Sequence, residues 1–148
     1  MRLSTVGRYA LRAMVDLALN AEGEPVLCKE IAERQEVSNQ YLSQLFLKLR
    51  RAGLIESVRG PGGGYVLARD AAQISARDVL RAVDETLDPV FCVDEGQELA
   101  CPRVDGCPTH WLWARLGDAI HRVLDSVTVA ELCQHSGQAT AQQIDITM

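Results

Sequence analysis

Three cysteines and one histidine stand within nineteen residues of an acidic, loop-like stretch. They are Cys92, Cys101, Cys107 and His110, spaced C-x8-C-x5-C-x2-H. Thiolates bind zinc and iron–sulfur clusters, and imidazole binds zinc and iron. Pro108 suits the first turn of a helix, so Cys107 would lie where the positive end of the helix dipole favours a thiolate. The four side chains are therefore interpreted as a metal or iron–sulfur site.

The spacing favours a cluster over a structural zinc ion but does not settle the choice. Zinc sites commonly pair cysteines separated by about two to four residues, and these three cysteines lie further apart. Four donors suffice for a [2Fe–2S] centre, in which histidine reduces the negative charge and makes ligation pH-dependent. The other two cysteines, Cys28 and Cys133, stand in apolar helical contexts and are interpreted as packing residues.

Charge is divided unevenly along the 148 residues. The net charge is −5, yet residues 1–70 carry +2 and residues 71–148 carry −7. Five of the six charged side chains from position 48 to position 69 are basic, which is typical of a protein surface that binds nucleic acid. We find no long apolar run and no signal-peptide pattern, so we expect a cytoplasmic protein with no membrane contact. In that compartment clustered cysteines favour metal binding over disulfides.

The apolar pattern predicts a mainly α fold with a small β-hairpin wing. Helices are expected over about 6–20, 28–35, 39–52, 76–86 and 108–127, followed by a last short helix opened by Thr128 and Glu131. Two short strands, at 54–59 and 65–68, flank the glycine-rich segment 60–64. Helix, turn, helix and hairpin is the order of a winged helix-turn-helix.

The outward face of helix 39–52 is polar. It carries Asn39, Gln40, Ser43, Gln44 and Arg50, with Tyr41 near its N-terminal end. Short amides and hydroxyls at the start of a second helix suit the reading of base edges in the major groove. Arg59 at the base of the glycine-rich tip could enter a minor groove, and Gly60 and Gly62 would let the backbone approach phosphates. A nucleotide-binding loop is excluded because G-x-x-x-x-G-K-[ST] is absent.

Helix 108–127 has more apolar side chains than one small domain beside it could easily cover. We expect it to be a dimerisation helix, with a core helix of a monomer as the alternative. The candidate contacts are Trp111, Leu112, Leu116, Ile120 and Val123. A homodimer would supply the two-fold symmetry that palindromic half-sites in DNA require.

Four segments resemble the Isc-type iron–sulfur cluster regulators of the Rrf-two family of winged helix-turn-helix transcription factors. They are MRLSTVGRYA at 1–10, YLSQLF at 41–46, VRGPGGGY at 58–65 and CPTHWLW at 107–113. The resemblance covers about residues 1–133. It implies a non-enzymatic homodimer that binds palindromic promoter DNA and holds a [2Fe–2S] cluster through Cys92, Cys101, Cys107 and His110.

The resemblance also implies which residues contact DNA and what the protein senses. Ser38, Tyr41, Gln44 and Arg59 would contact DNA, with Arg2, Ser4 and Arg8 near phosphates. Cluster occupancy would report iron–sulfur supply, iron or oxidative stress, with the iron–sulfur assembly machinery as cluster donor. Promoters of iron–sulfur assembly genes would be repressed or activated accordingly. A small redox enzyme or electron carrier is disfavoured, because it would leave the helix-turn-helix without a role.

Two departures from the family pattern keep alternatives open. The eight-residue gap before Cys101 is longer than usual, which allows a nitric-oxide-sensing or iron-sensing relative with another cluster type, or a zinc-bound regulator. Ser43 stands where familiar members have an acidic residue that repels DNA, so the cluster-free form would discriminate less between sites. The expected division is a winged domain (1–86), a cluster-binding loop (87–107), dimerisation and C-terminal helices (108–133) and a flexible tail (134–148).

Overall fold

The computed structural model describes residues 2–93 and 101–136. Part of the expected cluster loop and most of the expected tail therefore lie outside the described residues. The elements are α1 (Thr5–Asn20), α2 (Cys28–Gln35), α3 (Asn39–Arg51), β1 (Ile55–Val58), β2 (Gly64–Leu67), the 3-10 turn η1 (Ala71–Gln73), α4 (Ala76–Ala82), the 3-10 turn η2 (Phe91–Val93) and α5 (Pro108–Ser126). Residues 129–136 are also helical. The prediction of a mainly α fold with a hairpin wing is confirmed.

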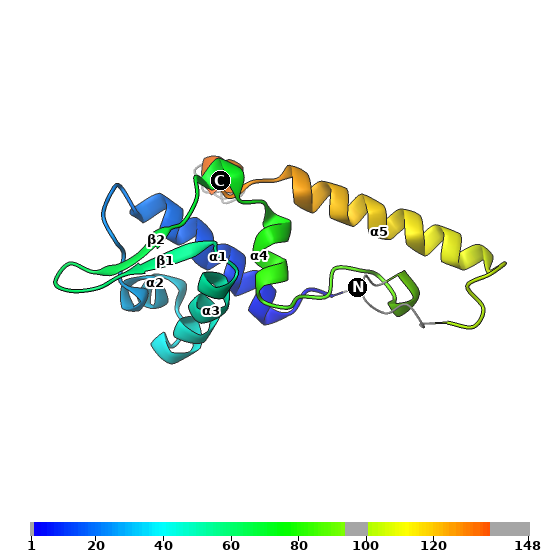
Figure 1. The fold of residues 1–148 in the computed structure, drawn as a ribbon, viewed down its shortest axis with the longest axis horizontal. Coiled ribbons are helices and arrows are strands. Elements are labelled where there is room, and N and C mark those ends of the chain that lie inside the picture. The colour runs from blue at the N-terminus through cyan, green and yellow to red at the C-terminus, as the bar shows by residue number, and fades with distance from the viewer. Residues whose placement is uncertain (1, 94–100, 137–148) are drawn as a thin grey trace, which may run out of the picture.

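Helices α2 and α3 form the helix-turn-helix (Figure 1). The turn begins at Glu36, whose φ of 57° is left-handed and whose N–H bonds back to α2 carbonyls. The Ser38 side chain then accepts the Tyr41 N–H at 3.0 Å and starts α3, as its N-cap position predicts. The predicted apolar face of α3 is buried, through Leu42, Leu45, Phe46 and Leu49. Its polar face is left on the surface.

The wing is a two-stranded antiparallel hairpin. Ile55 pairs with Leu67 at its base and Val58 with Gly64 near its tip. A Cβ at Gly63 would collide with two carbonyl oxygens of the tip, so this turn needs glycine. Val26, just before α2, pairs with Tyr65 through N–H···O bonds of 2.9 and 2.8 Å. The wing is thereby fastened to the helix-turn-helix.

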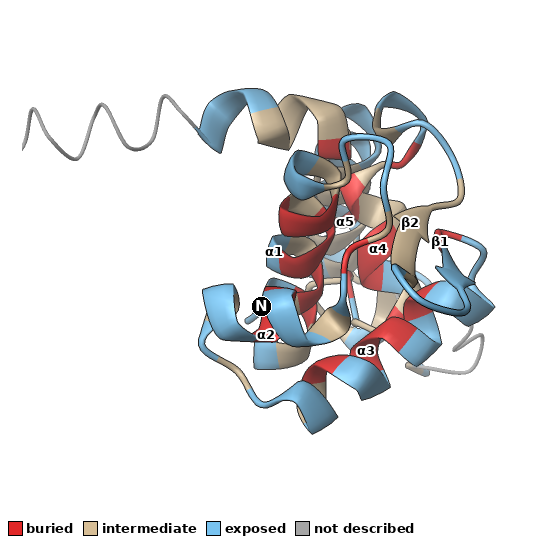
Figure 2. Ribbon diagram, turned by 90° about the vertical axis from the view of Figure 1, so that its left-hand side faces the viewer, coloured by how far each residue is buried: buried red, intermediate tan, exposed pale blue. Residues whose placement is uncertain are grey.

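One apolar core joins the N-terminal helices to the end of the chain. Met14, Phe46, Leu80 and Val129 are all fully buried, and Figure 2 shows buried residues along the inward faces of α1, α3 and α4. Val129 belongs to the helical segment after α5, and its N–H donates to the Ile74 carbonyl at 2.9 Å. After α5 the chain thus returns to the winged domain.

Helix α4 begins as expected and ends early. Ser75 and Asp78 form a capping box, each accepting the other's backbone N–H. The helix stops at Ala82, four residues before the predicted end, because Asp84 has a left-handed φ of 59° and the chain turns back. This turn points Glu85 toward α1 rather than along a helix axis.

Helix α5 extends away from the winged domain (Figure 1). Its boundaries, Pro108–Ser126, agree closely with the expected 108–127. Gly117 is its single buried residue among those that the structure describes. None of the helices in residues 2–93 and 101–136 has the length and apolar character needed to cross a bilayer.

Candidate metal centre and nucleic-acid interface

The segment before the cluster loop lies along α5 and brings two of the predicted ligands together. Asp88 Oδ1 lies 2.8 Å from Nε2 of His121, and Cys92 Sγ lies 3.4 Å from Nδ1 of His110. Gly117 lies between these contacts, where a Cβ would be within 3.5 Å of Asp88 Oδ1. Segment 88–93 therefore crosses α5 at its smallest residue and is fixed to the helix on either side.

The distance between Cys92 and His110 fits a shared metal ion. A tetrahedral metal with sulfur at about 2.3 Å and nitrogen at about 2.1 Å separates those two donors by about 3.6 Å. The observed Sγ–Nδ1 distance of 3.4 Å is close to that value. The pair is thus chemically and geometrically suited to ligation, with the histidine presented from the first turn of α5.

Cys107 and Cys101 make local contacts instead. Cys107 precedes the first residue of α5, and its Sγ lies 3.2 Å from the Thr109 hydroxyl. That hydroxyl and the backbone N–H of His110 lower the pKa of the Cys107 thiol, which favours the thiolate that metals bind. Cys101 Sγ accepts the Arg103 N–H at 3.4 Å. Within the described part of the chain, no three possible ligands are gathered at one point.

The two remaining cysteines pack against the core, as expected from their apolar helical contexts. Burial raises the pKa of both the Cys28 and Cys133 thiols. Cys28 Sγ also lies 3.6 Å from the Ser43 hydroxyl, so α2 and α3 meet at a thiol–hydroxyl contact. Sequence reasoning missed this contact, because it joins two helix faces whose angle is set by packing.

The candidate DNA-contacting residues of α3 and the wing, with one exception, are exposed. They are Ser38, Asn39, Gln40, Ser43, Gln44, Arg50, Arg59, Gly60 and Gly62. The exception is Tyr41, which packs edge-on against Tyr9 with ring centroids 6.1 Å apart. Its hydroxyl is buried and has no hydrogen-bond partner among the described residues. In the structure Tyr41 therefore supports the position of α3 with its ring, and its polar atom is turned away from solvent.

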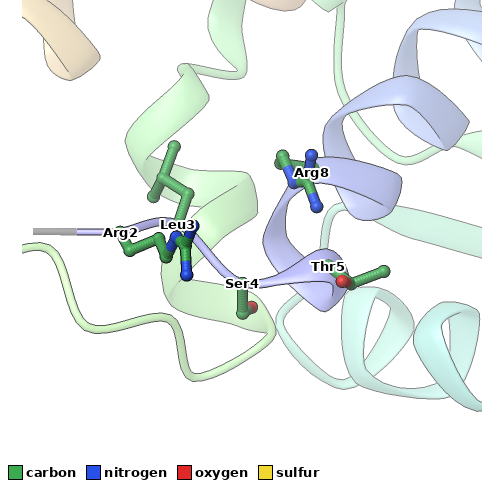
Figure 3. Close-up of a pocket in the computed structure, with 5 residues that line it drawn as sticks. All are labelled: Arg2, Leu3, Ser4, Thr5 and Arg8. Atoms are coloured by element: carbon green, nitrogen blue, oxygen red, sulfur yellow. The ribbon is translucent and has the colours of Figure 1, made fainter.

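The N-terminal candidates surround an open pocket of about 920 Å³. It is lined by Arg2, Leu3, Ser4, Thr5 and Arg8 (Figure 3). Both arginines are exposed, so two guanidinium groups are available to an anion. Ser4 is engaged by the protein, because its hydroxyl donates to a carboxylate oxygen of Glu85 and its Oγ accepts the Gly7 N–H. Sequence reasoning missed Glu85, which lies 81 residues away along the chain.

The expected dimerisation face of α5 is largely exposed. Trp111 is 63% exposed and Val123 60%, with Leu112 and Leu116 also open to solvent. Ile120 is partly buried. The guanidinium carbon of Arg115 lies 5.2 Å from the centroid of the Trp111 ring, which covers part of that ring with charge. An apolar stripe of this length is unusual on a free surface.

A helix-turn-helix with an exposed polar reading face, followed by a glycine-tipped wing, defines a winged-helix DNA-binding protein. Residues 3–135 match the family model Rrf2, described as an iron-dependent transcriptional regulator. The chain belongs to the Rrf2 family and is a transcriptional regulator of the IscR type rather than an enzyme.

Relatives in sequence and structure agree with this assignment. Over 132 residues the chain is 49% identical to the HTH-type transcriptional regulator IscR of Cronobacter sakazakii and 48% identical to that of Escherichia coli; each match covers 89% of this chain and 80% of the relative. The IscR structure of T. potens has a TM-score of 0.76 at 39% identity, covering 94% of this chain and 90% of that chain. CymR, the global cysteine regulator of B. subtilis, has a TM-score of 0.74 at 38% identity, covering 91% and 98%.

Proposed function

We propose that this regulator holds a [2Fe–2S] cluster through Cys92, Cys101, Cys107 and His110, and that cluster occupancy changes its DNA binding. The observation that carries the proposal is the 3.4 Å separation of Cys92 Sγ and His110 Nδ1. The lowered pKa of the Cys107 thiol supports a third ligand at the start of the same helix. A bound cluster would supply redox chemistry at that point.

The residues around the ligands connect the site to the rest of the chain. Segment 88–93 is held on α5 by the Asp88–His121 contact as well as by Cys92. Because only residues 83–87 separate α4 from this segment, a change in how Cys92 is held would reach α4 through a short stretch of chain. We infer that the winged domain (1–86) responds to the cluster loop (87–107) by this route.

We propose that the protein binds palindromic promoter DNA as a homodimer. The exposed polar side chains of α3 would read the major groove, and Arg59 with the glycines of the wing would reach the adjacent backbone or minor groove. Arg2 and Arg8 would contact phosphates, with Ser4 beside them. The exposed face of α5, from Trp111 to Val123, would join the two protomers. Ser43 places no negative charge on the reading face, so we expect weak discrimination between sites without the cluster.

The cellular role follows from the family. We infer a cytoplasmic regulator that receives its cluster from the iron–sulfur assembly machinery. It would repress or activate promoters of iron–sulfur assembly genes according to iron–sulfur, iron or oxidative status. Residues 108–133 would comprise the dimerisation helix and the C-terminal helix, and residues 134–148 would form a tail.

A second candidate is a regulator with another cluster type or with zinc. The observation that favours it is the eight-residue gap between Cys92 and Cys101, together with the local hydrogen bond that Cys101 makes to Arg103. In that case Cys101 would not complete the ligand set, and three ligands would remain.

Anaerobic purification with an absorption spectrum tests these alternatives. The proposal expects a coloured protein whose visible absorption is lost in Cys107→Ala and kept in Cys133→Ala. Loss of colour in Cys92→Ala but not in Cys101→Ala would contradict four-residue ligation. Colourless protein with stoichiometric zinc would exclude the cluster. A DNA-shift assay with and without the bound group would then show whether occupancy changes binding.

A further inference from the structure

Glu85 connects the end of α4 to the first turn of α1. Its Oε1 accepts the backbone N–H of Ser4 at 2.8 Å, and its Oε2 accepts the Ser4 hydroxyl proton. The same hydroxyl oxygen accepts the N–H of Gly7 at 3.2 Å and so caps α1. One carboxylate therefore fixes both the backbone and the side chain of the residue at which α1 begins.

The contact is shaped from the α1 side as well. Gly7 is buried, and a Cβ at that position would lie 2.7 Å from Glu85 Oε2 and 3.1 Å from a methyl carbon of Leu80. Only a residue without a side chain allows the carboxylate to come this close. The left-handed turn at Asp84 supplies the other half of the arrangement, because it directs Glu85 back toward α1.

The placement of Glu85 is unusual for a surface that meets DNA. It is joined to Ser4, which lines the same open pocket as the exposed arginines Arg2 and Arg8. A free carboxylate there would repel phosphate. This one is bonded to an N–H and an O–H at the positive end of the α1 dipole, which offsets much of its charge.

We infer that Glu85 is a positioning residue for DNA binding. It anchors the segment before α1 so that Arg2 and Arg8 are presented together to the phosphate backbone. The inference rests on the proposed phosphate contacts of these two arginines. Without the carboxylate, residues 2–4 would be deprived of the tertiary contact that the structure gives them through Ser4. Each phosphate contact would then have to be formed at an added cost in chain entropy.

Removal of the Glu85 carboxylate should change DNA affinity in the direction opposite to that expected from charge alone. Removing a negative charge from a DNA-binding protein ordinarily strengthens its binding to a polyanion. We expect Glu85→Ala to weaken binding instead, by about tenfold at low salt, with the salt slope falling by about 1 for each phosphate that the variant no longer neutralises. The matched control is Glu22→Ala, an exposed carboxylate in the α1–α2 connection, which should leave affinity unchanged or raise it.

The measurement is fluorescence anisotropy over a salt series. Two labelled duplexes are used, one selected from a random pool with the wild-type chain and one unselected. Because phosphate contacts carry no sequence information, Glu85→Ala should weaken binding to both duplexes equally and leave the ratio of the two affinities unchanged. A fall in the ratio of the affinities for the selected and the unselected duplex would indicate that α3 is disturbed, and would overturn the positioning role.

Two further variants separate positioning from unfolding. Ser4→Ala removes only the hydroxyl contact and should give a smaller loss in the same direction. Gly7→Ala leaves Glu85 in the chain but pushes its carboxylate aside, so it should copy Glu85→Ala. Thermal unfolding of each variant shows whether the fold is kept. If the folded Gly7→Ala protein bound DNA like wild type, the inference would be wrong.

Arg8→Ala distinguishes this inference from the phosphate contacts that it requires. Weaker binding in Arg8→Ala with normal binding in Glu85→Ala would refute the positioning role alone. Normal binding in Arg8→Ala would refute the phosphate contact and the inference together. The double variant supports the inference if its loss is clearly smaller than the sum of the two single losses, since both changes then remove one shared interaction.

Discussion

Nε2 of His121 lies 2.8 Å from Oδ1 of Asp88, and both side chains are largely buried, 15% and 7% exposed. The contact lies eleven residues along α5 from His110 and four residues before Cys92. It therefore fixes the start of the cluster loop to the helix, independently of the cysteine.

His121→Ala tests the importance of this contact. We expect a loss of about 1–3 kcal/mol in the free energy of unfolding, because a buried carboxylate loses a hydrogen-bond partner. We also expect faster bleaching of the visible absorption in air. Urea denaturation and timed spectra measure the two effects. The control is His135→Ala, an exposed histidine on the helical segment after α5. Equal bleaching rates in both variants would show that the loop is held by its ligands alone.

The thiols should differ in reactivity in the protein without a bound metal or cluster. Hydrogen bonds to the Cys107 sulfur lower its pKa, so its thiolate appears at lower pH than that of an ordinary cysteine. Burial raises the pKa of Cys28 and Cys133, whose thiolates appear at higher pH. Alkylation followed by mass spectrometry across a pH series should modify Cys107 first. Thr109→Val should move the alkylation of Cys107 to higher pH. If the substitution had no effect, the Thr109 hydroxyl would not be what lowers the pKa of this thiol.

The wing arginine should contribute to DNA affinity. Arg59 is exposed at the end of β1, beside the glycine tip. Arg59→Ala should cost about 1–3 kcal/mol of binding free energy if it makes a groove contact. Anisotropy titration measures the loss. Arg122→Ala, which removes the same charge from exposed α5, is the control and should change affinity little. Similar losses in the two variants would indicate a general effect of net charge.

The exposed stripe of α5 should hold two protomers together. Leu116→Glu places a charge in that stripe and should shift the protein toward monomers in sedimentation experiments, because burying an unpaired carboxylate is costly. Leu27→Glu makes the same change at a leucine that is 51% exposed before α2, and should leave association intact. A Leu116→Glu protein that sediments like wild type would place the interface elsewhere.

A buried carboxylate ties α1 to α2. Asp16 is 5% exposed and accepts hydrogen bonds from Arg34 at 2.7 Å, Gln35 at 2.8 Å and Asn20 at 3.2 Å. Asp16→Ala should lower the free energy of unfolding by about 1–3 kcal/mol, less than for a fully buried pair because Arg34 is partly exposed. Glu33→Ala, at an exposed position on α2, should have little effect. Denaturant titration compares the two variants.

Local patterns predicted most of the fold. The stripe from Leu42 to Leu49 identified α3, and glycines identified the hairpin tip, because these signals depend on near neighbours in the chain. The predicted end of α4 was wrong, because it depends on contacts between residues far apart in the chain. Apolar periodicity continues past Ala82, but Asp84 takes a left-handed conformation, and its carboxylate lies 3.4 Å from Lys48 Nζ on α3. A contact between residues 36 positions apart leaves no trace in a local pattern.

The candidate ligands were identified from residue type, and the arrangement of only two of them agrees with a shared site. Cys92 and His110 were proposed as ligands from composition, and the structure places them together through the packing of segment 88–93 on α5. Cys101 and Cys107 hydrogen-bond to close neighbours in the chain. Glu85 had no motif to reveal it, since its role depends on a tertiary contact with Ser4.

The basic residues near α3 and the wing have a consequence for how fast the protein finds DNA. Residues 48–69, which include the end of α3 and both strands of the wing, carry five basic side chains and one acidic side chain. The positive field of this surface favours encounters in which it faces the DNA. The association rate should therefore fall as salt screens that attraction.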